Sequence, residues 1–409
     1  MVVSVIAEYN PFHNGHRFHL DESRRLSGCE RVVAVMSGNF VQRGEPAVFD
    51  KYIRAEAALN NGADLVVELP VYYAGASAEY FAGGAVRLIQ KTGISDCISF
   101  GSESGDMNAM EKVADFLYLN NGEYVLALKK FLKTGVSFPI ARKAAVEEVS
   151  GGSLNAGLLD KPNDTLGIEY LKAVKTYAYK TRFITVKRAV GHRKNEAVEF
   201  ASASALRAAI CENRLVDIKN AVPDNVFQII ESAVKTGNGP YISNNLSPLL
   251  HYLVKTRGAN YIKNIFETAE GLENRIVRST GKYYHLKDII TDIKTKRYTL
   301  TKINRILLHI ILNLTKDDYD MYERAGGPQY IRVLGFKKES ADLLNMLEKK
   351  AELPLVMNLK KDIKKLPPLA EAMLMKEIEC GNIYYLTNNA VNNDFMERDL
   401  EYGKPLVIV

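Results

Sequence analysis

The alternation of short apolar runs with helical patterns over the first hundred residues constrains the fold of this chain most. Four runs have the length of a β-strand and are largely apolar: Val2 to Ala7, Arg31 to Met36, Asp64 to Leu69 and Cys97 to Phe100. The stretches between them have helical patterns: Gly15 to Leu26, Asp50 to Asn60 and Ser77 to Lys91. Strands that are apolar throughout are typical of a parallel sheet that is covered by helices on both faces. The pattern therefore predicts an α/β fold.

The α/β pattern extends further along the chain. Residues 106–149 form a helical stretch, and a helix is expected from Thr165 to Tyr179. Arg182 to Arg188 returns to strand character, and another helix is expected from Ala201. We therefore expect a first domain over residues 1–220, with a Rossmann-like parallel sheet and a helical insertion after its fourth strand.

Strand signals fade beyond Pro223, and the second half of the chain reads as mainly helical. Helices are predicted at Phe227 to Lys235, Ser247 to Lys255, Tyr261 to Glu270, Leu286 to Lys294, Lys302 to Leu314 and Lys338 to Lys349. Only Pro354 to Asn358 and Pro405 to Val409 are expected to be extended. We therefore expect a mainly helical second domain over residues 221–409.

Composition narrows the class of protein. The four cysteines are far apart and none has C-x-x-C spacing, so neither a zinc site nor a disulfide framework is expected: Cys29, Cys97, Cys211 and Cys380. A net charge of +6 permits a polyanionic partner without requiring one. The chain shows no signal peptide and no apolar run near the ~20 residues that span a bilayer. We expect a cytoplasmic protein with no membrane contact, and no protein partner is evident.

The sequence His13-Asn14-Gly15-His16 follows the first predicted strand and opens a helix. Ligands of parallel sheets bind at the carboxyl ends of strands, and a helix N-terminus attracts phosphate. Two histidines can stabilise charge that develops on a phosphoryl group, and Gly15 lets a nucleotide approach the backbone. A single histidine is more often structural, but this position favours nucleotide binding.

A second motif, Ser202-Ala203-Ser204-Ala205-Leu206-Arg207, follows a predicted strand and begins a helix. Hydroxyl side chains at a helix start can cap the helix or bind an anion. Arg207 lies one turn beyond Ser204 and can reach the same phosphates. The alternative is an ordinary helix cap followed by a surface arginine. No P-loop sequence is present, so a kinase-like phosphate cradle is not supported.

Together these motifs resemble the H-x-G-H nucleotidyltransferase superfamily. The chain is most similar there to the bacterial tRNA(Met) cytidine acetate ligase family. The matching segments are Glu8 to His16, Ser37 to Pro46, Ser77 to Ala82, Phe100 to Glu103, Asn163 to Tyr170, Lys296 to Thr299 and Ile303 to Leu308. The resemblance covers nearly the whole chain, and its motifs are specific when taken together. Two departures are Pro162 before Asn163, and Ala203 and Ala205 in the serine motif, which leave two hydroxyls there.

The resemblance implies a nucleotidyltransferase domain and a two-step reaction. Acetate attacks the α-phosphate of ATP to give acetyl-adenylate and pyrophosphate. The N4 amine of the wobble cytidine of elongator tRNA(Met) then takes the acetyl group and releases AMP. Mg²⁺ is expected with ATP, but the sequence identifies no acidic ligand for it and no metal site.

The resemblance also implies the residues of the ATP site, with His13 and His16 as the catalytic pair. The residues are Ala7, Glu8, Tyr9, Asn10, Pro11, Phe12, His13, Asn14, Gly15, His16, Leu20, Gly101, Asn163 and Arg188. We add Ser204 and Arg207 from the second motif. Alone, Gly101 reads equally well as a turn glycine, Asn163 as a helix cap and Arg188 as a surface arginine.

Basic and amide side chains suggest where tRNA binds. Lys294, Lys296, Arg297, Lys302 and Arg305 surround Tyr298, which could offer a stacking ring. Asn39, Gln42 and Arg43 follow the second strand, and Lys51 lies close behind them. From these sets we predict contacts to tRNA at Asn39, Gln42, Arg43, Lys51, Lys296, Arg297 and Arg305. The alternative for the basic run is a solvated helix face.

Two other functions remain open at this level. An adenylyltransferase that acts on a small phosphorylated metabolite would use the same two histidines but would need no long basic C-terminal half. An RNA-binding protein without activity would have no chemical use for both histidines.

Overall fold

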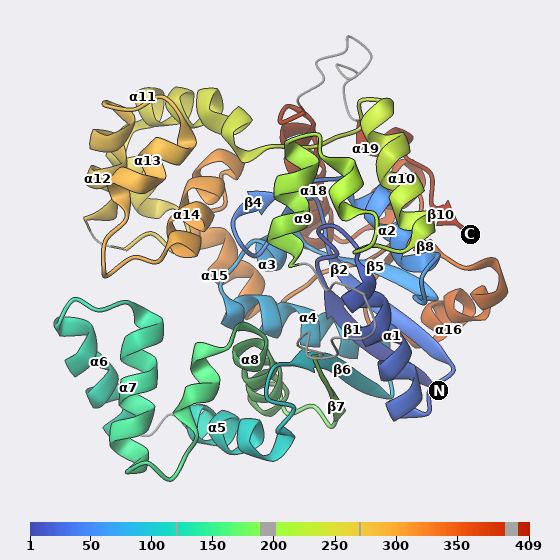
Figure 1. The fold of residues 1–409 in the computed structure, drawn as a ribbon, viewed down its shortest axis with the longest axis horizontal. Helices are drawn as coiled ribbons and strands as arrows, with labels where there is room; N and C mark the ends of the chain where they lie inside the picture. The colour runs from blue at the N-terminus through green and yellow to red at the C-terminus, as the bar shows by residue number, and fades with distance from the viewer. Residues whose placement is uncertain (120–121, 189–201, 270, 389–399) are drawn as a thin grey trace.

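The computed structural model describes residues 1–119, 122–188, 202–269, 271–388 and 400–409. A central twisted sheet is surrounded by helices (Figure 1). The strands of this sheet are β1 (Val2–Ala7), β2 (Arg31–Ser37), β5 (Leu65–Leu69), β6 (Cys97–Ser102), β7 (Arg182–Lys187), β8 (Ile331–Phe336), β9 (Leu355–Val356) and β10 (Val407–Ile408). A separate hairpin is formed by β3 (Phe40–Val41) and β4 (Glu45–Pro46).

The strand order is β10-β8-β5-β2-β1-β6-β7, and β9 pairs with β8. The strands β5, β2, β1, β6 and β7 are parallel, as the sequence predicts. The chain moves outward in one direction from β1 through β2 to β5, and in the other through β6 to β7. The order therefore reverses between β1 and β6, and ligands of such sheets bind at the carboxyl ends of the strands at this point.

One edge of the sheet differs from the prediction. β8 pairs antiparallel with β5, and β10 pairs with β8, so the second half of the chain completes the sheet. The sheet is therefore mixed and mostly parallel, and residue 220 is not its boundary. The α/β class is confirmed, but the expectation that the chain after Pro223 contributes only helices and isolated extended pieces is wrong. β8 was not predicted because it lies among helical patterns, and its partner strand β5 is more than two hundred residues earlier in the sequence.

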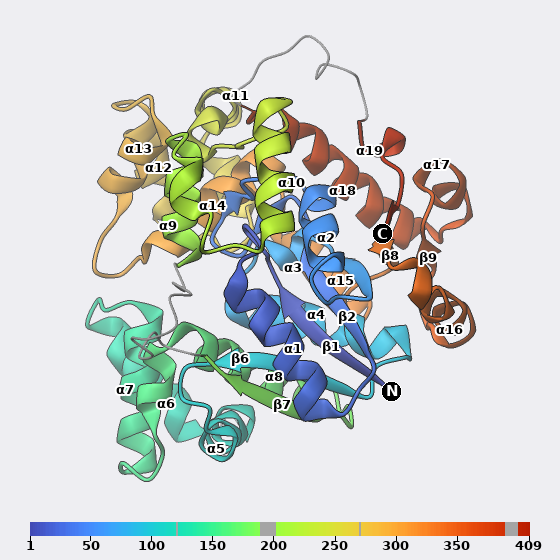
Figure 2. The same ribbon diagram turned by 45° about the vertical axis from the view of Figure 1, so that its right-hand side comes forward.

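The strands alternate between two hydrophobic cores because successive side chains point to opposite faces. Val3 and Val5 of β1 pack into one core with Leu20, while Val33 and Val35 of β2 pack into the other. The first core lies under α1 (Asn14–Ser27), α2 (Lys51–Leu59) and α10 (Asp224–Lys235), which Figure 2 shows on one face of the sheet. Burial on both faces explains why these strands are apolar at nearly every position.

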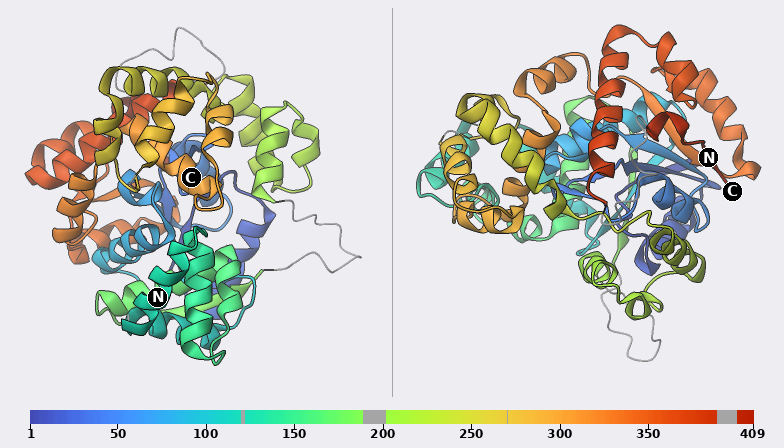
Figure 3. Two further views of the ribbon diagram at one scale, coloured as in Figure 1. Left: turned by 90° about the vertical axis from the view of Figure 1, so that its left-hand side faces the viewer. Right: turned by 90° about the horizontal axis from the view of Figure 1, so that it is seen from above.

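The remaining helices add to these two cores or form two groups beside the sheet. They are α3 (Val71–Ala74), α4 (Ala78–Thr92), α5 (Met107–Leu119), α6 (Gly122–Lys133), α7 (Phe138–Ser150), α8 (Pro162–Thr176), α9 (Ala203–Cys211), α11 (Ser247–Asn264), α12 (Leu272–Thr280), α13 (Leu286–Ile293), α14 (Leu300–Leu312), α15 (Lys316–Arg324), α16 (Asp342–Lys350), α17 (Leu359–Asp362), α18 (Pro368–Tyr385) and α19 (Leu400–Gly403). The group α5–α7 is the predicted insertion after β6, and α11–α14 form the other group (Figure 3).

Most predicted helices are present, with three differences. The expected helix at 261–270 is wrong, because α11 runs to Asn264 and Ile265 then forms a bridge with Thr315. A break within α11 at Gly258, whose φ is 68°, accounts for the interrupted helical pattern there. Helices α12, α15 and α18 were not predicted. The prediction of a helix start at Ala201 falls on a residue outside the described part of the chain; α9 begins at Ala203.

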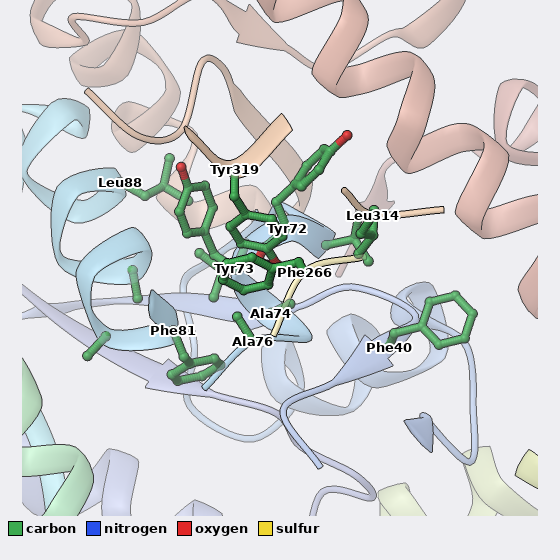
Figure 4. Packing of buried hydrophobic residues seen from close by; sticks show 14 of the residues in the cluster. Phe40, Tyr72, Tyr73, Ala74, Ala76, Phe81, Leu88, Phe266, Leu314 and Tyr319 are labelled. Carbon is green, nitrogen blue, oxygen red and sulfur yellow. The ribbon is translucent and has the colours of Figure 1, made fainter. Parts of the chain in front are cut away.

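Aromatic side chains join the helical part to the sheet. Phe266 stacks on Tyr319 of α15 with their centroids 3.3 Å apart, and the Tyr319 hydroxyl donates to the carbonyl of Tyr72 in α3 (Figure 4). Nε2 of the buried His309 in α14 lies 2.9 Å from the carbonyl oxygen of Gly75, which follows α3. These contacts hold α14 and α15 against the segment that follows β5. In the described residues, no helix is long and apolar enough to cross a membrane.

Candidate functional site

The two motif histidines stand at the carboxyl end of β1, at the reversal of strand order. His13 is the N-cap of α1, and His16 occupies the first turn. Their rings stack with centroids 3.7 Å apart and an angle of 15° between the planes. Nδ1 of His16 accepts the backbone N–H of His13 at 3.2 Å. A neutral imidazole that accepts at Nδ1 carries its proton at Nε2, so His16 presents Nε2–H as a donor.

Both histidines are neutral at physiological pH. Burial, reinforced by the positive charge of Arg188, lowers the pKa of His13 to about 4. Burial lowers the pKa of His16 well below its usual value, and His13, His19 and Arg188 lower it further. A neutral imidazole is the better fixed donor here, because it gives a hydrogen bond without transferring a proton. Two such donors at a helix N-terminus can stabilise negative charge on a phosphoryl group.

Sequence reasoning did not single out His19, which lies one turn after His16 on the same helix. Nε2 of His19 and the hydroxyl of Tyr9 are buried without a hydrogen-bond partner. Burial, with Arg188 nearby, lowers the pKa of His19 to about 4. Buried polar groups in proteins are nearly always paired, so unpaired ones at a site fit a polar ligand. The i, i+3 spacing from His16 is the signal that could have identified His19.

Gly101 and Arg188 lie on adjacent strands beside the histidines. Gly101 of β6 pairs with Val186 of β7, and Arg188 follows β7 and donates its backbone N–H to Ser102 at 2.8 Å. A Cβ on Gly101 would meet only Cγ of Arg188, at an ordinary 3.7 Å. The protein itself therefore leaves room for a side chain at Gly101, and any requirement for glycine comes from a ligand.

Asn163 differs from its predicted placement. Helix α8 begins at Pro162 with Lys161 as its N-cap, so Asn163 lies within the first turn and is not the cap. The carboxylate of Glu103 accepts the side-chain amide of Asn163 at 2.6 Å, and also its backbone N–H and that of Asp164. No separate role was predicted for Glu103, although it lies in a segment that matches the family. Glu103 neutralises this helix N-terminus and fixes Asn163.

The second motif reaches the first one through Arg207. Nη1 of Arg207 donates to the carbonyl oxygen of Asn10 at 2.9 Å. Ser202 is the N-cap of α9, and its hydroxyl lies 3.2 Å from that of the exposed Ser204. The structure thus brings together segments that are nearly 200 residues apart in the sequence. Arg207 supports the backbone of the turn rather than extending freely toward a phosphate.

Arg54 supports the same turn from the interior and was not identified from the sequence. Its fully buried guanidinium donates to the carbonyls of Glu8, Ser37, Gly38 and Phe49. It therefore joins the carboxyl end of β1 to that of β2. Asn10 adds a second tie, because its side-chain oxygen accepts the N–H of Val48 at 2.8 Å. The other residues expected at the ATP site lie along the same segment: Ala7 ends β1, Pro11 and Phe12 form the turn, and Asn14 and Gly15 begin α1.

Leu20 differs from the other residues of that segment. Its side chain is fully buried in the core between α1 and the sheet. A contact from that side chain to ATP is therefore wrong, and Leu20 instead anchors the helix that carries the histidines.

Two segments predicted to contact tRNA lie side by side. The β3–β4 hairpin carries Gln42 and the exposed Arg43, and its Glu45 accepts from the side chain of Asn304 in α14 at 3.3 Å. A Cβ on Gly44 would lie 2.3 Å from the backbone nitrogen of Arg305. The hairpin therefore packs directly on the first turns of α14. Lys296 and Arg297, which precede that helix, are exposed.

Several residues predicted to contact tRNA do not reach the surface. Lys51 is fully buried, with its ammonium 2.7 Å from Glu68 and 3.0 Å from Glu401. Asn39 is 2% exposed, and its side chain accepts the backbone N–H of Lys51. A contact from Lys51 or Asn39 to tRNA is therefore wrong. Both positions follow a strand in the sequence, but the C-terminal part of the chain covers them.

The basic run around α14 is also partly internal. Arg305 forms an ion pair of 2.7 Å with Glu267, and both side chains are largely buried. Tyr298 is 8% exposed, so it cannot offer an open stacking ring. Of the residues predicted to contact tRNA, four are therefore still accessible: Gln42, Arg43, Lys296 and Arg297. Among the described residues, no three His, Cys, Asp or Glu side chains gather as metal ligands would.

Comparison with known proteins agrees with this geometry. Residues 1–399 match the family described as HIGH Nucleotidyl Transferase. The chain is 45% identical over 356 residues to the tRNA(Met) cytidine acetate ligase of Caldanaerobacter subterraneus subsp. tengcongensis, which covers 87% of this chain and 88% of the relative. It is 37% identical to the protein of that name from Acetivibrio thermocellus over the full length of both chains.

A solved structure is similar over the whole chain. The crystal structure of Thermotoga maritima TmcAL bound with alpha-thio ATP has a TM-score of 0.92 and 35% sequence identity, and the match covers 100% of this chain and 99% of that one. The similarity therefore includes both the sheet and the helical groups.

Proposed function

The chain belongs to the HIGH nucleotidyl transferase family and, within it, to the tRNA(Met) cytidine acetate ligases, and on this basis we propose that it acetylates a cytidine of elongator tRNA(Met) in two steps. The sequence matches to relatives of this name extend over most of both chains, and one similar structure holds an ATP analogue. The acceptor is the N4 amine of the wobble cytidine, and the acetyl donor is acetate itself. Because its substrates are ATP and tRNA, we expect the enzyme in the cytoplasm.

In the first step, a carboxylate oxygen of acetate attacks the α-phosphorus of ATP. A bond forms between that oxygen and phosphorus, and the bond to the pyrophosphate oxygen breaks. Negative charge grows on the α-phosphoryl oxygens and on the leaving group. The neutral stacked pair His13 and His16 is the observation that carries this proposal, because it offers fixed donors at the N-terminus of α1.

The groups around the histidines fit ATP in other respects. His19 and Tyr9 hold unpaired polar atoms, and Arg188 brings a positive charge close enough to lower the pKa of all three histidines. Gly101 leaves space on the neighbouring strand. Exposed Ser204 lies near Arg207 on α9 and adds a hydroxyl to the side of the turn. Mg²⁺, which commonly accompanies ATP, would be held mainly by the phosphates and water.

In the second step, the cytidine amine attacks the acetyl carbon of the adenylate, and AMP leaves. The hairpin that carries Gln42 and Arg43 lies against both the turn after β1 and the start of α14. With Lys296 and Arg297, it provides positive charge that can bind tRNA phosphates beside the adenylate. The proposed tRNA contacts therefore come from both halves of the chain: the hairpin lies within residues 1–220, and Lys296 and Arg297 lie within residues 221–409.

The test is pyrophosphate release from ATP by the purified protein, with acetate and tRNA omitted in turn. Release that requires acetate, followed by transfer of labelled acetyl to elongator tRNA(Met), is the expected result. A tRNA transcript with uridine in place of the wobble cytidine should accept no label. Release that ignores acetate and responds instead to a phosphorylated metabolite would overturn the proposal in favour of an adenylyltransferase.

Variants of the two histidines distinguish a role in adenylate formation from a role in tRNA binding. His13→Ala and His16→Ala should each abolish pyrophosphate release, whereas tRNA affinity measured by filter binding should change by no more than about twofold. Equal loss of both properties would give the histidines a structural role instead.

A further inference from the structure

The transfer step needs a group that removes a proton from the attacking amine, and Glu8 lies where such a group is required. Glu8 follows the last residue of β1 and precedes the turn that carries the histidines. Its Oε1 accepts the backbone N–H of Gln42 at 2.9 Å, which ties it to the β3–β4 hairpin. The carboxylate thus stands between the histidine turn and the hairpin that we assign to tRNA.

The surroundings of Glu8 suit a residue that accepts a proton. The residue is half-buried, at the boundary between the core and the surface. One oxygen is held by Gln42, which fixes the orientation of the carboxylate. Charged groups from several elements face it: Arg43 from the hairpin, Arg54 from α2 and Arg207 from α9. Tyr170 of α8 also lies close to Glu8: burial raises the pKa of its hydroxyl, and the charge of Glu8 adds to that shift.

The histidines are less suited to this task. The Nδ1 lone pair of His16 already accepts the N–H of His13, and its other nitrogen carries a proton. His13 and His16 also face the phosphoryl group in the first step. Burial raises the pKa of Glu8 above its usual value even though Gln42 and three arginines oppose this shift, so Glu8 is a stronger base than an ordinary carboxylate.

Resting on the proposed function, we propose that the Glu8 carboxylate hydrogen-bonds the N4 amine of the acceptor cytidine and takes its proton during acetyl transfer. Carboxylates accept from the N4 amine of cytosine, which also distinguishes this base from uracil, whose O4 is an acceptor. Glu8 would therefore contribute to both the chemistry and the choice of base. In the sequence, Glu8 was expected only as part of the ATP site.

Acetyl transfer forms one bond from carbon to nitrogen and breaks one bond from carbon to oxygen. The nitrogen lone pair forms a bond to the acetyl carbon, and the carbonyl π electrons move to oxygen. The nitrogen gives one proton to Glu8. The carbonyl then re-forms while the bond from carbon to the AMP oxygen breaks, and AMP leaves with those electrons. Glu8 afterwards returns its proton to solvent.

The experiment measures both steps for Glu8→Gln. Acetate-dependent exchange of labelled pyrophosphate into ATP reports adenylate formation. Rapid-quench transfer of labelled acetyl from enzyme-bound acetyl-adenylate to an elongator tRNA(Met) transcript reports the second step. Removing a general base typically costs 10²- to 10⁴-fold, so we expect transfer to slow by about that factor and adenylate formation to slow far less. Glu8→Asp, which keeps the carboxylate, should recover part of the transfer rate.

A pH profile adds a readout that a structural role would not change. In the wild type, transfer should slow as pH falls through the pKa of Glu8, because the protonated acid cannot accept a proton. In Glu8→Gln that limb should disappear. Glu231→Gln is the control, because it removes one carboxylate charge from the exposed face of α10, where Glu231 pairs with Lys235, and it should change either step by only about twofold.

The outcomes separate the two proposals. A wild-type enzyme that transfers no acetyl group to tRNA would overturn the proposed function itself. An enzyme that acetylates tRNA, but whose Glu8→Gln variant slows both steps equally or keeps the acidic limb of the transfer rate, would overturn the role of Glu8 alone.

Discussion

Nη1 of Arg207 lies 2.9 Å from the carbonyl oxygen of Asn10, so α9 is joined to the turn that carries the two histidines. A charged donor contributes about 1.5–3 kcal/mol to such a bond. Arg207→Ala should therefore lower kcat/KM for pyrophosphate release by about 10- to 100-fold. Arg214→Ala is the control, because Arg214 pairs only with exposed Glu212 and Asp217. Equal effects of the two variants would show that the bond to Asn10 does not support the site.

The histidine pair should make adenylate formation insensitive to mild acid. Burial holds the pKa of His13 at about 4 and that of His16 well below its usual value, so both stay neutral as pH falls from 8 to about 5.5. The rate of acetate-dependent pyrophosphate exchange should show no histidine titration in this range. A decrease in the wild-type exchange rate with an apparent pKa near 6.5 would contradict a neutral pair.

Lys51 should act on stability rather than on tRNA binding. Removing one member of a buried ion pair leaves its partners without compensation, which costs about 3–5 kcal/mol. Lys51→Met should lower the free energy of unfolding in urea by about the lower end of that range, because Glu68 and Glu401 lose one of the two cations that they share and keep Arg332. Lys235→Met removes an exposed lysine and should cost no more than about 0.5 kcal/mol. A Lys51→Met protein of normal stability but weakened tRNA affinity would contradict this assignment.

Exposed cations should set the salt dependence of tRNA binding. Each phosphate contact that is lost should reduce the slope of log affinity against log salt by about one. We expect this reduction for Arg43→Ala and for Arg297→Ala, measured by filter binding at several salt concentrations. Arg305→Ala should leave the slope unchanged, since its guanidinium pairs with Glu267. A smaller slope for Arg305→Ala than for Arg43→Ala would reverse their assignments.

Glu377 should make stability depend on pH. Burial and the neighbouring charge of Glu68 raise the pKa of Glu377 to about 8, and an oxygen of each carboxyl group lies near Gly38. A folded pKa above the unfolded value stabilises the protein at low pH, and this contribution is lost as pH rises from about 4.5 to about 8. Wild type should therefore lose stability relative to Glu377→Gln across this range in urea titrations. A constant difference between the two would show that Glu377 does not titrate there.

The sequence was sufficient where one local pattern determines the outcome. The strands β1, β2, β5 and β6 are apolar on both faces, and the position of His13 after β1 follows from that pattern alone. Arg207 was expected to reach the phosphates of ATP, and in the structure it lies against the turn that carries the histidines, where it binds the carbonyl of Asn10. The resemblance extended these expectations to Gly101, Asn163 and Arg188.

The rest depended on long-range packing, which a local pattern does not contain. The local sequence around Lys51 suggests an exposed lysine. In the structure Glu401 and Arg332, which come much later in the chain, lie against it and bury it. The four carbonyls that Arg54 binds come from three separate segments. Glu103, sixty residues before Asn163, accepts the first N–H groups of α8, and the pattern at the helix start alone could not identify it.

The antiparallel strand β8 also has a consequence for synthesis of the chain. β5 is made early, but its partner β8 leaves the ribosome only after more than two hundred further residues, which takes on the order of ten seconds or more. During that interval β5 is an open edge, and open edges recruit strands from other chains. Glu68 of β5 and Lys51 beside it are charged, and Arg332 of β8 pairs with Glu68 only when the edge closes. The charges of Glu68 and Lys51 therefore disfavour pairing with foreign strands at this edge until Arg332 and Glu401 arrive and bury them.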